Sequence, residues 1–205
     1  MIKPIVEGHG EVEALPVLLR RVAGECFGIW DVPLLRPGRY PATRLLRTEN
    51  GVWKPGPDFA KAGQHARNEG ATSILAVLDL DDGCPKVVYE SLVSSLAAAT
   101  GLSPSCLVLA KCEYEAWFLA SCESLKDGIE PYPKDPEDVR AAKEALERHL
   151  QLEFPYVETT DQPGYSSRID LKSAYRRSRS FRKLVKEFRH LLTHQGLKPA
   201  AWLPV

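Results

Sequence analysis

Residues 73–85 read SILAVLDLDDGCP, an uncharged apolar run that ends in three carboxylates. The stretch from Ile74 to Leu78 is rich in branched side chains, which is typical of a strand covered on both faces in a parallel sheet. Asp79 stands at the carboxyl end of this predicted strand, where open α/β sheets bind their ligands. We therefore take this strand as the centre of the fold and its acidic end as the first candidate site.

The carboxylates at this strand end predict a site for a divalent cation. Alternate residues of an extended chain point the same way, so Asp79 and Asp81 share a face while Leu80 returns to the core. Two converging carboxylates repel each other at neutral pH, and a hard cation such as Mg²⁺, which keeps several of its waters, relieves the repulsion. In the alternative interpretation these acids and Asp82 only cap a helix and solvate an Asp-Gly turn.

Predicted strands and helices alternate along the rest of the chain. Their order predicts an α/β protein with a largely parallel sheet, right-handed crossovers and helices on both faces. Apolar patterns and turn residues predict strands over 2–6, 29–35, 74–78 and 106–110, helices over about 12–22, 58–69, 85–100 and 137–150, a loop with a short helix over 39–57, and a break over 158–164.

Length and composition indicate one soluble unit. The 205 residues allow one sizeable core but are short for two full domains, so we expect an α/β core over 1–125 and a helical extension over 126–205 that packs on it. The five cysteines are odd in number and form no CxxC pair, which indicates a cytosolic protein without disulfides or structural zinc. No segment is typical of an export signal or a membrane span, so we expect a cytoplasmic protein.

Charge is unevenly distributed, although 27 basic and 27 acidic residues balance overall. Residues 165–198 hold ten Lys or Arg against two acids, and they include a predicted amphipathic helix with cations between its apolar positions. This basic end is either an ordinary solvated face or a surface for nucleic acid or an acidic partner. The candidate nucleic-acid-binding residues are Arg179, Arg182, Lys183, Lys186 and Arg189.

Acidic residues follow three separate predicted strands. The carboxyl ends of parallel strands lie at one edge of a doubly wound sheet, so these side chains should meet. Gly8 and Gly10 in the first of these turns let the backbone approach a ligand. They lack the third glycine of a dinucleotide fingerprint, and no nucleotide cofactor is expected. The acids are Glu7, Glu11, Asp79, Asp81, Asp82, Glu113 and Glu115.

A strand followed by Glu-Gly and, about seventy residues later, a strand followed by Asp-x-Asp resembles the TOPRIM domain of topoisomerases, primases and the overcoming-lysogenization-defect nucleases. The chain resembles still more closely a bacterial family of small TOPRIM-like proteins of unassigned function. The shared motifs are VEGxxE, a DxDDxCP-like turn, EYEAWFLA, and a late DQP followed by SFRK. They stand here at 6–11, 79–85, 113–120, 161–163 and 180–183.

The resemblance implies a TOPRIM-like, Rossmann-like fold and a Mg²⁺- or Mn²⁺-dependent phosphodiesterase, that is, a nuclease acting on DNA or another nucleic acid. It makes Glu7 an acid/base or metal-binding residue, and Asp79 and Asp81 metal ligands. The further residues assigned through it are Lys111 as a catalytic group, with Glu11, Asp82 and Glu115 as metal ligands.

The resemblance also bears on partners. Similar domains are often paired with an ATPase, which implies an ATPase partner and a role as the effector of a bacterial defence system against phage. The alternative class is a non-catalytic TOPRIM-like module that binds a protein partner and keeps the acids as a structural ion site.

Overall fold

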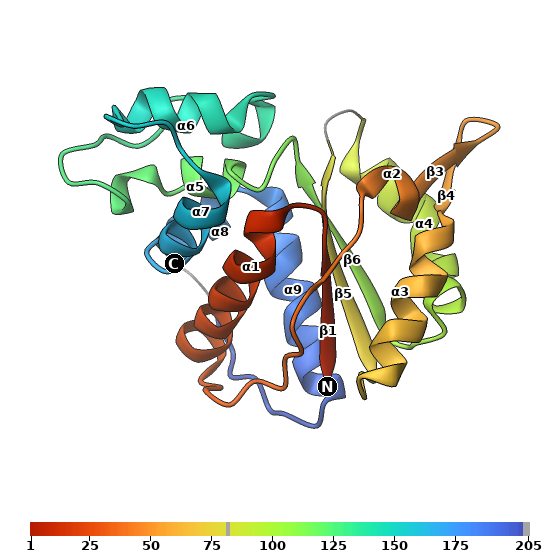
Figure 1. Ribbon diagram of the computed structural model, residues 1–205. Helices are drawn as coiled ribbons and strands as arrows, with labels where there is room; N and C mark the ends of the chain where they lie inside the picture. The colour runs from red at the N-terminus through yellow and green to blue at the C-terminus, as the bar shows by residue number, and fades with distance from the viewer. Residues whose placement is uncertain (81–82, 203–205) are drawn as a thin grey trace.

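A four-stranded parallel sheet with the strand order β2-β1-β5-β6 forms the centre of the computed structural model, which describes residues 1–80 and 83–202 (Figure 1). Its strands are β1 (Ile2–Val6), β2 (Gly38–Arg39), β5 (Ser73–Leu80) and β6 (Ser105–Lys111). All three neighbouring pairs run parallel. The expected α/β class with a largely parallel sheet is therefore confirmed.

Helices cover both faces of this sheet. The expected helices over 12–22, 58–69 and 85–100 are confirmed as α1, α3 and α4, and α1 continues into a π-helical turn. In the part of the chain that the structure describes, no helix is both long and apolar enough to cross a bilayer. The helices are α1 (His9–Arg21), α2 (Ala42–Leu45), α3 (Pro57–Asn68), α4 (Pro85–Thr100), α5 (Ala116–Leu119), α6 (Ala142–Leu150), α7 (Glu158–Ser166), α8 (Leu171–Arg177) and α9 (Arg179–His194).

β5 shows how one strand serves two layers. Leu75 and Val77 belong to a core cluster with α1 and α9, whereas Ile74 and Ala76 belong to a second cluster with α3 and α4. This alternation is the two-residue period of a strand buried on both faces. Leu80 follows the same rule and lies in the α3 and α4 cluster, as the sequence predicts.

The expected strand over 29–35 is wrong. This segment makes a single bridge between Leu34 and Ile2, and regular pairing with β1 resumes only at β2. Pro33, which has no N–H to donate, interrupts the run. Between Leu34 and β2 the pairing beside β1 is therefore interrupted. The backbone of Pro4 faces this interruption, because backbone groups alternate from one side of a strand to the other. The missing N–H of Pro4 therefore costs no ladder hydrogen bond.

The segment over 39–57 contains the expected short helix, α2, and also a hairpin that was not predicted. β3 (Leu46–Glu49) and β4 (Val52–Pro55) pair antiparallel around Asn50 and Gly51, whose φ angles are 51° and 76°. Positive φ at both central residues is what a two-residue hairpin turn requires, and Asn-Gly is its common sequence.

The C-terminal helices belong to the main core. α9 packs against β5 and β6, and α7 packs along α1. A Cβ on Gly10 would lie 2.3 Å from Oε1 of Gln162, so only glycine allows α1 and α7 to approach this closely. The expected break over 158–164 is wrong, because this segment forms most of α7.

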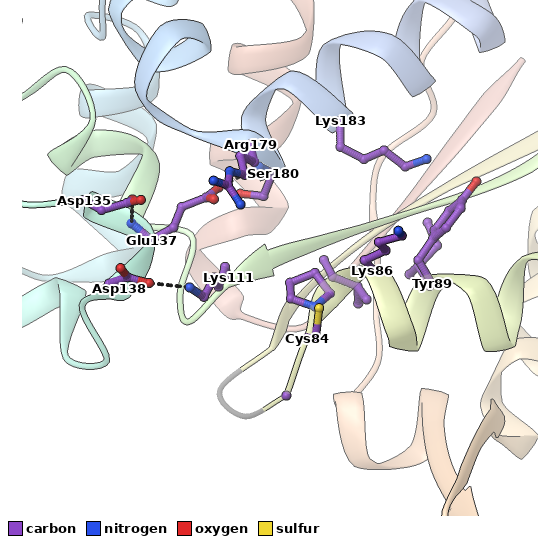
Figure 2. Close-up of a pocket in the computed structure, with 14 residues that line it drawn as sticks. Cys84, Lys86, Tyr89, Lys111, Asp135, Glu137, Asp138, Arg179, Ser180 and Lys183 are labelled. Atoms are coloured by element: carbon purple, nitrogen blue, oxygen red, sulfur yellow. Dashed lines mark hydrogen bonds and ion pairs between the residues drawn. The ribbon is translucent and has the colours of Figure 1, made fainter.

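β6 forms one edge of the sheet. A cavity of about 610 Å³ runs along its outer side between α4 and α9 (Figure 2). A smaller cavity, described next, lies at the carboxyl ends of β1 and β5.

Candidate functional site

An acidic cavity of about 310 Å³ lies at the carboxyl ends of β1 and β5. From these two strands the chain crosses over in opposite directions, to β2 on one side and to β6 on the other. Such a switch point is where open α/β sheets bind ligands. Carboxylates at the carboxyl ends of β1, β5 and β6 line the cavity, together with others from the first turn of α1, from α6 and from α7: Glu7, Glu11, Asp79, Glu113, Glu115, Glu144 and Glu158.

Glu11 closes the first turn of its own helix. Its Oε2 accepts hydrogen bonds from the backbone N–H groups of Glu7 (3.0 Å) and Gly8 (3.2 Å). Burial raises the pKa of Glu11 to about 7, although these two donors act in the opposite direction, and the carboxylate of Glu115 adds to the rise. Glu11 therefore exchanges a proton near neutral pH.

Asp79, the residue before the last of β5, carries a side-chain oxygen that the described chain does not use. Its Oδ1 is buried and has no hydrogen-bond partner among residues 1–80 and 83–202. Burial raises the pKa of Asp79 well above its usual range, and the carboxylates of Glu11 and Glu115 raise it further. A buried acceptor without a donor is costly, so this oxygen favours a proton or a cation.

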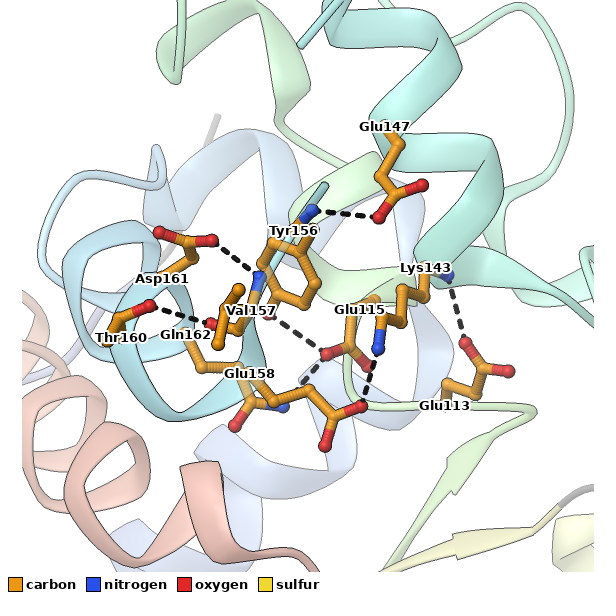
Figure 3. A network of polar contacts seen from close by, with 10 residues as sticks. All are labelled: Glu113, Glu115, Lys143, Glu147, Tyr156, Val157, Glu158, Thr160, Asp161 and Gln162. Atoms are coloured by element: carbon orange, nitrogen blue, oxygen red, sulfur yellow. Dashed lines mark hydrogen bonds and ion pairs between the residues drawn. The ribbon is translucent and has the colours of Figure 1, made fainter. Parts of the chain in front are cut away.

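Glu115 is held by side chains that come from 40 or more residues later in the chain (Figure 3). Its Oε1 accepts hydrogen bonds from the Tyr156 hydroxyl (3.0 Å) and from Nε2 of Gln162 (2.9 Å). Burial raises the pKa of Glu115 although both donors lower it. Oε1 of Gln162 is a second buried acceptor for which the described residues offer no donor.

Lys143 is the only cation among the described residues that line the acidic cavity. Its backbone N–H donates to Oε2 of Glu113, and its Nζ donates to Oε1 of Glu158, each at 3.0 Å (Figure 3). The hydrogen bond to Glu158 raises the pKa of Lys143, and burial raises the pKa of Glu113. The sequence analysis missed Lys143, because only the packing of α6 over the strand ends brings it here.

The remaining expected site residues are Lys111 and two that the structure does not describe. Lys111 lines the neighbouring cavity along β6, not the acidic cavity, and its ammonium pairs with Asp138 (Figure 2). Asp81 and Asp82 are outside the described residues. The structure therefore brings together Glu7, Glu11, Asp79 and Glu115 from the expected set and separates Lys111 from them.

The five expected nucleic-acid-binding cations share one surface. They line a hollow of about 390 Å³ on α9, and no carboxylate occurs among the described residues that line it. Aromatic side chains of Phe27, Tyr175 and Trp202 contribute to its walls. The amphipathic helix thus packs its apolar face on the sheet of its own chain and leaves its cations outside.

The acidic cavity has the donor chemistry of a divalent-metal site. Mg²⁺ and Mn²⁺ prefer carboxylate and water oxygens, and Asp79 offers a buried oxygen without a partner in the described chain. Within residues 1–80 and 83–202, however, no three His, Cys, Asp or Glu side chains are grouped so that they could hold an ion. The carboxylate oxygens of the cavity suit a cation that keeps part of its water shell. The described residues alone, however, do not form a complete and compact set of ligands.

Comparison with known proteins identifies a family without an assigned function. The model of the Domain of unknown function (DUF4276) matches residues 6–189, which include all the strand ends of the acidic cavity and most of α9. No curated protein and no solved structure matches the chain. The expectation of a family of unassigned function is confirmed: the chain belongs to the DUF4276 family.

Proposed function

We propose that this protein is a TOPRIM-like, divalent-metal-dependent phosphodiesterase that cleaves nucleic acid. The observation that carries the proposal is Asp79, which lines a cavity rich in carboxylates and whose buried Oδ1 lacks a partner in the described chain. Carboxylates gathered in this way repel each other when ionised, and a cation relieves the repulsion. The pairing of β1 with β5, which sets Glu7 and Asp79 at the ends of adjacent strands, supports the TOPRIM resemblance.

Glu7 and Asp79 would hold the cation, with Asp81 as the further ligand that the resemblance implies. A cation bound there supplies neutralisation of phosphate charge and a bound water of lowered pKa. Glu11 holds the turn after β1 through two backbone N–H groups, so it keeps Glu7 in place. Glu115 anchors α7 through Gln162 and thereby closes one wall of the cavity.

Lys143 would take the role that the sequence analysis gave to Lys111. A phosphate entering a cavity of carboxylates needs a positive group, and Lys143 is the only one in the described lining. Its partner Glu158 has a half-exposed side chain, and exposed ion pairs of this kind are weak. We expect Lys143 to leave Glu158 and bind a non-bridging oxygen of the substrate phosphate, while the cations of α9 contact the strand farther along.

Replacing the proposed ligand by an uncharged residue of the same shape tests this proposal. Asp79→Asn keeps the shape of the side chain but weakens it as a ligand, so it should abolish both a Mn²⁺-induced rise in Tm and Mn²⁺-dependent cleavage of DNA or RNA. Asp127→Asn, at an exposed acid away from the cavity, is the matched control and should change neither. Cleavage that persists unchanged in Asp79→Asn would come from another site or a contaminating nuclease.

A second candidate is a non-catalytic interaction module that keeps a structural ion site. Two of the cavity acids favour it, because Glu11 and Glu115 already carry hydrogen bonds that hold α1 and α7. An ATPase partner and a role in phage defence, both implied by the resemblance, are proposals under either candidate. Metal binding that Asp79→Asn abolishes, with no cleavage of any nucleic acid by the wild type, would favour the module.

A further inference from the structure

β6 leaves one edge of the sheet open, because among residues 1–80 and 83–202 it pairs with β5 alone. The N–H of Cys112 donates to the C=O of Leu80 (3.1 Å), and the N–H of Ile74 donates to the C=O of Pro104 (3.2 Å). The backbone N–H and C=O groups of the even-numbered residues of β6 therefore point toward β5. Backbone groups alternate along a strand, so those of the odd-numbered residues face outward. The outward-facing residues nearest the carboxyl end of β6 are Leu107, Leu109 and Lys111.

These same three residues line the cavity of about 610 Å³ beside β6. Leu107 and Leu109 are 1% and 4% exposed, so the edge is recessed between α4 and α9. In the described chain no hydrogen bond engages their outward backbone groups. Buried backbone N–H and C=O groups are nearly always paired in native proteins. The edge thus combines unused hydrogen-bonding groups with space beside them.

The walls on both sides of this edge carry cations. Alternate side chains of a strand added to β6 would point toward α4, which bears Lys86, and toward α9, which bears Arg179 and Lys183. Lys183 pairs with Glu187 (2.6 Å), and its Nζ lies 3.6 Å from the ring centroid of Tyr89 on the opposite wall. Arg179 has no ion pair among residues 1–80 and 83–202.

The carboxylates of this cavity are used by the chain itself. Asp138 pairs with Lys111, and Asp135 accepts the backbone N–H of Glu137. Glu137 in turn accepts the backbone N–H of Ser180 (2.6 Å) at the start of α9. Two of the wall cations are used as well, because Lys86 pairs with Glu90 and Lys183 with Glu187, so Arg179 is the wall cation without an ion pair in the described chain.

We propose that the free edge of β6 binds an extended, acidic peptide segment of a partner protein, which adds to the sheet as a fifth strand. Main-chain hydrogen bonds give such strand addition its affinity, and alternate side chains give it specificity. The edge from Leu107 to Lys111 spans about 13 Å at about 3.3 Å per residue, enough for four or five residues of a partner.

Two other occupants fit the edge less well. A nucleic-acid backbone offers phosphate acceptors but no regular donors, whereas this edge presents both N–H and C=O groups. A second copy of the chain would bring the same wall cations together, and like charges repel. An acidic peptide satisfies both the backbone groups and the charge.

Three terminally blocked synthetic peptides of about eight residues test the proposal. One alternates Asp and Val, the second has the same sequence with N-methyl groups on alternate residues, and the third alternates Lys and Val. We expect the first to bind, by fluorescence anisotropy, and the other two to bind at least about tenfold more weakly. Bound peptide should also slow hydrogen exchange at the outward amides of Leu107, Leu109 and Lys111.

A pair of protein variants isolates the edge hydrogen bond. Lys111→Ala removes the charge and the pair with Asp138, whereas Lys111→Pro also removes the outward N–H, and proline is tolerated on edge strands. We expect the Pro variant to bind the acidic peptide at least about fivefold more weakly than the Ala variant. Should Lys111→Pro fail to fold, Arg179→Ala compared with Lys61→Ala, an exposed cation on α3, tests the wall charge instead.

Several results would overturn the proposal. They are no binding of the acidic peptide at about 1 mM, equal binding of its N-methylated form, or unchanged hydrogen exchange at the three amides. Sedimentation that shows a dimer of the chain alone, with these amides protected, would assign the edge to a second copy. None of these measurements depends on phosphodiesterase activity.

Discussion

Replacing Glu11 by Gln should stabilise the metal-free protein at neutral and alkaline pH. Gln can still accept the N–H groups of Glu7 and Gly8, but it cannot ionise inside the acidic cavity. Folding raises the pKa of Glu11 from 4.5 to about 7. The contribution of protonated Glu11 to the free energy of unfolding of the wild type is therefore present in full below about pH 4.5, and it is lost as the pH rises through about 7. The advantage of the Gln variant should grow over the same interval.

The size of the effect follows from this pKa difference. At about 1.36 kcal/mol for each pKa unit, the interval from 4.5 to about 7 corresponds to at most about 3 kcal/mol in the free energy of unfolding. Solvent screening removes little of it because Glu11 is 3% exposed, whereas the weaker acceptor strength of an amide lowers it. For a chain of this size about 3 kcal/mol raises Tm by roughly 6–12 °C.

Urea unfolding followed by tryptophan fluorescence measures this effect, at about pH 5 and about pH 8 with a chelator present. Glu13→Gln is the matched control, because Glu13 lies on the same helix but is exposed and pairs with Arg36 at the surface. We expect a clear gain for Glu11→Gln at the higher pH and little change for Glu13→Gln. Saturating Mn²⁺ should reduce the gain, because a cation in the cavity offsets the repulsion that the ionised Glu11 meets from the neighbouring carboxylates. An equal gain at both pH values, or a loss at the higher one, would refute the reasoning.

Two further predictions concern the packing of α1 and the surface of α9. Gly10→Ala places a Cβ 2.3 Å from Oε1 of Gln162, so we expect a loss of about 1–3 kcal/mol in urea unfolding, whereas Gly164→Ala, with no atom within 4 Å of its Cβ, should cost little. Equal stability of the two variants would contradict the docking of α7 on α1. Replacing the α9 cations by Gln should weaken binding to single- and double-stranded DNA and RNA and flatten its salt dependence, and a wild type that binds none of them at low salt would exclude direct engagement. These cations are Arg182, Lys183, Lys186 and Arg189.

Local sequence patterns were sufficient for the elements that are buried on both faces. The apolar runs over 2–6, 74–78 and 106–110 became β1, β5 and β6, because the strands of a parallel sheet covered on both faces are mostly apolar. β2 has only two residues, which is too short for any periodic signal. The hairpin of β3 and β4 does carry a local signal, the Asn-Gly pair of its turn.

In the candidate site, too, some residues could be predicted from the sequence and others depend on tertiary packing. The sequence by itself determined that Glu7, Asp79 and Glu115 end up near one another, because each follows a strand and parallel strands end at one edge of a sheet. Only the tertiary structure decided that Lys143 lines the acidic cavity while Lys111 pairs with Asp138 outside it. The alternation of strands and helices along the chain predicts parallel strands, and parallel strands end at one edge of the sheet. Which remote helix covers that end depends on how α6 and α7 pack, and no local period records it.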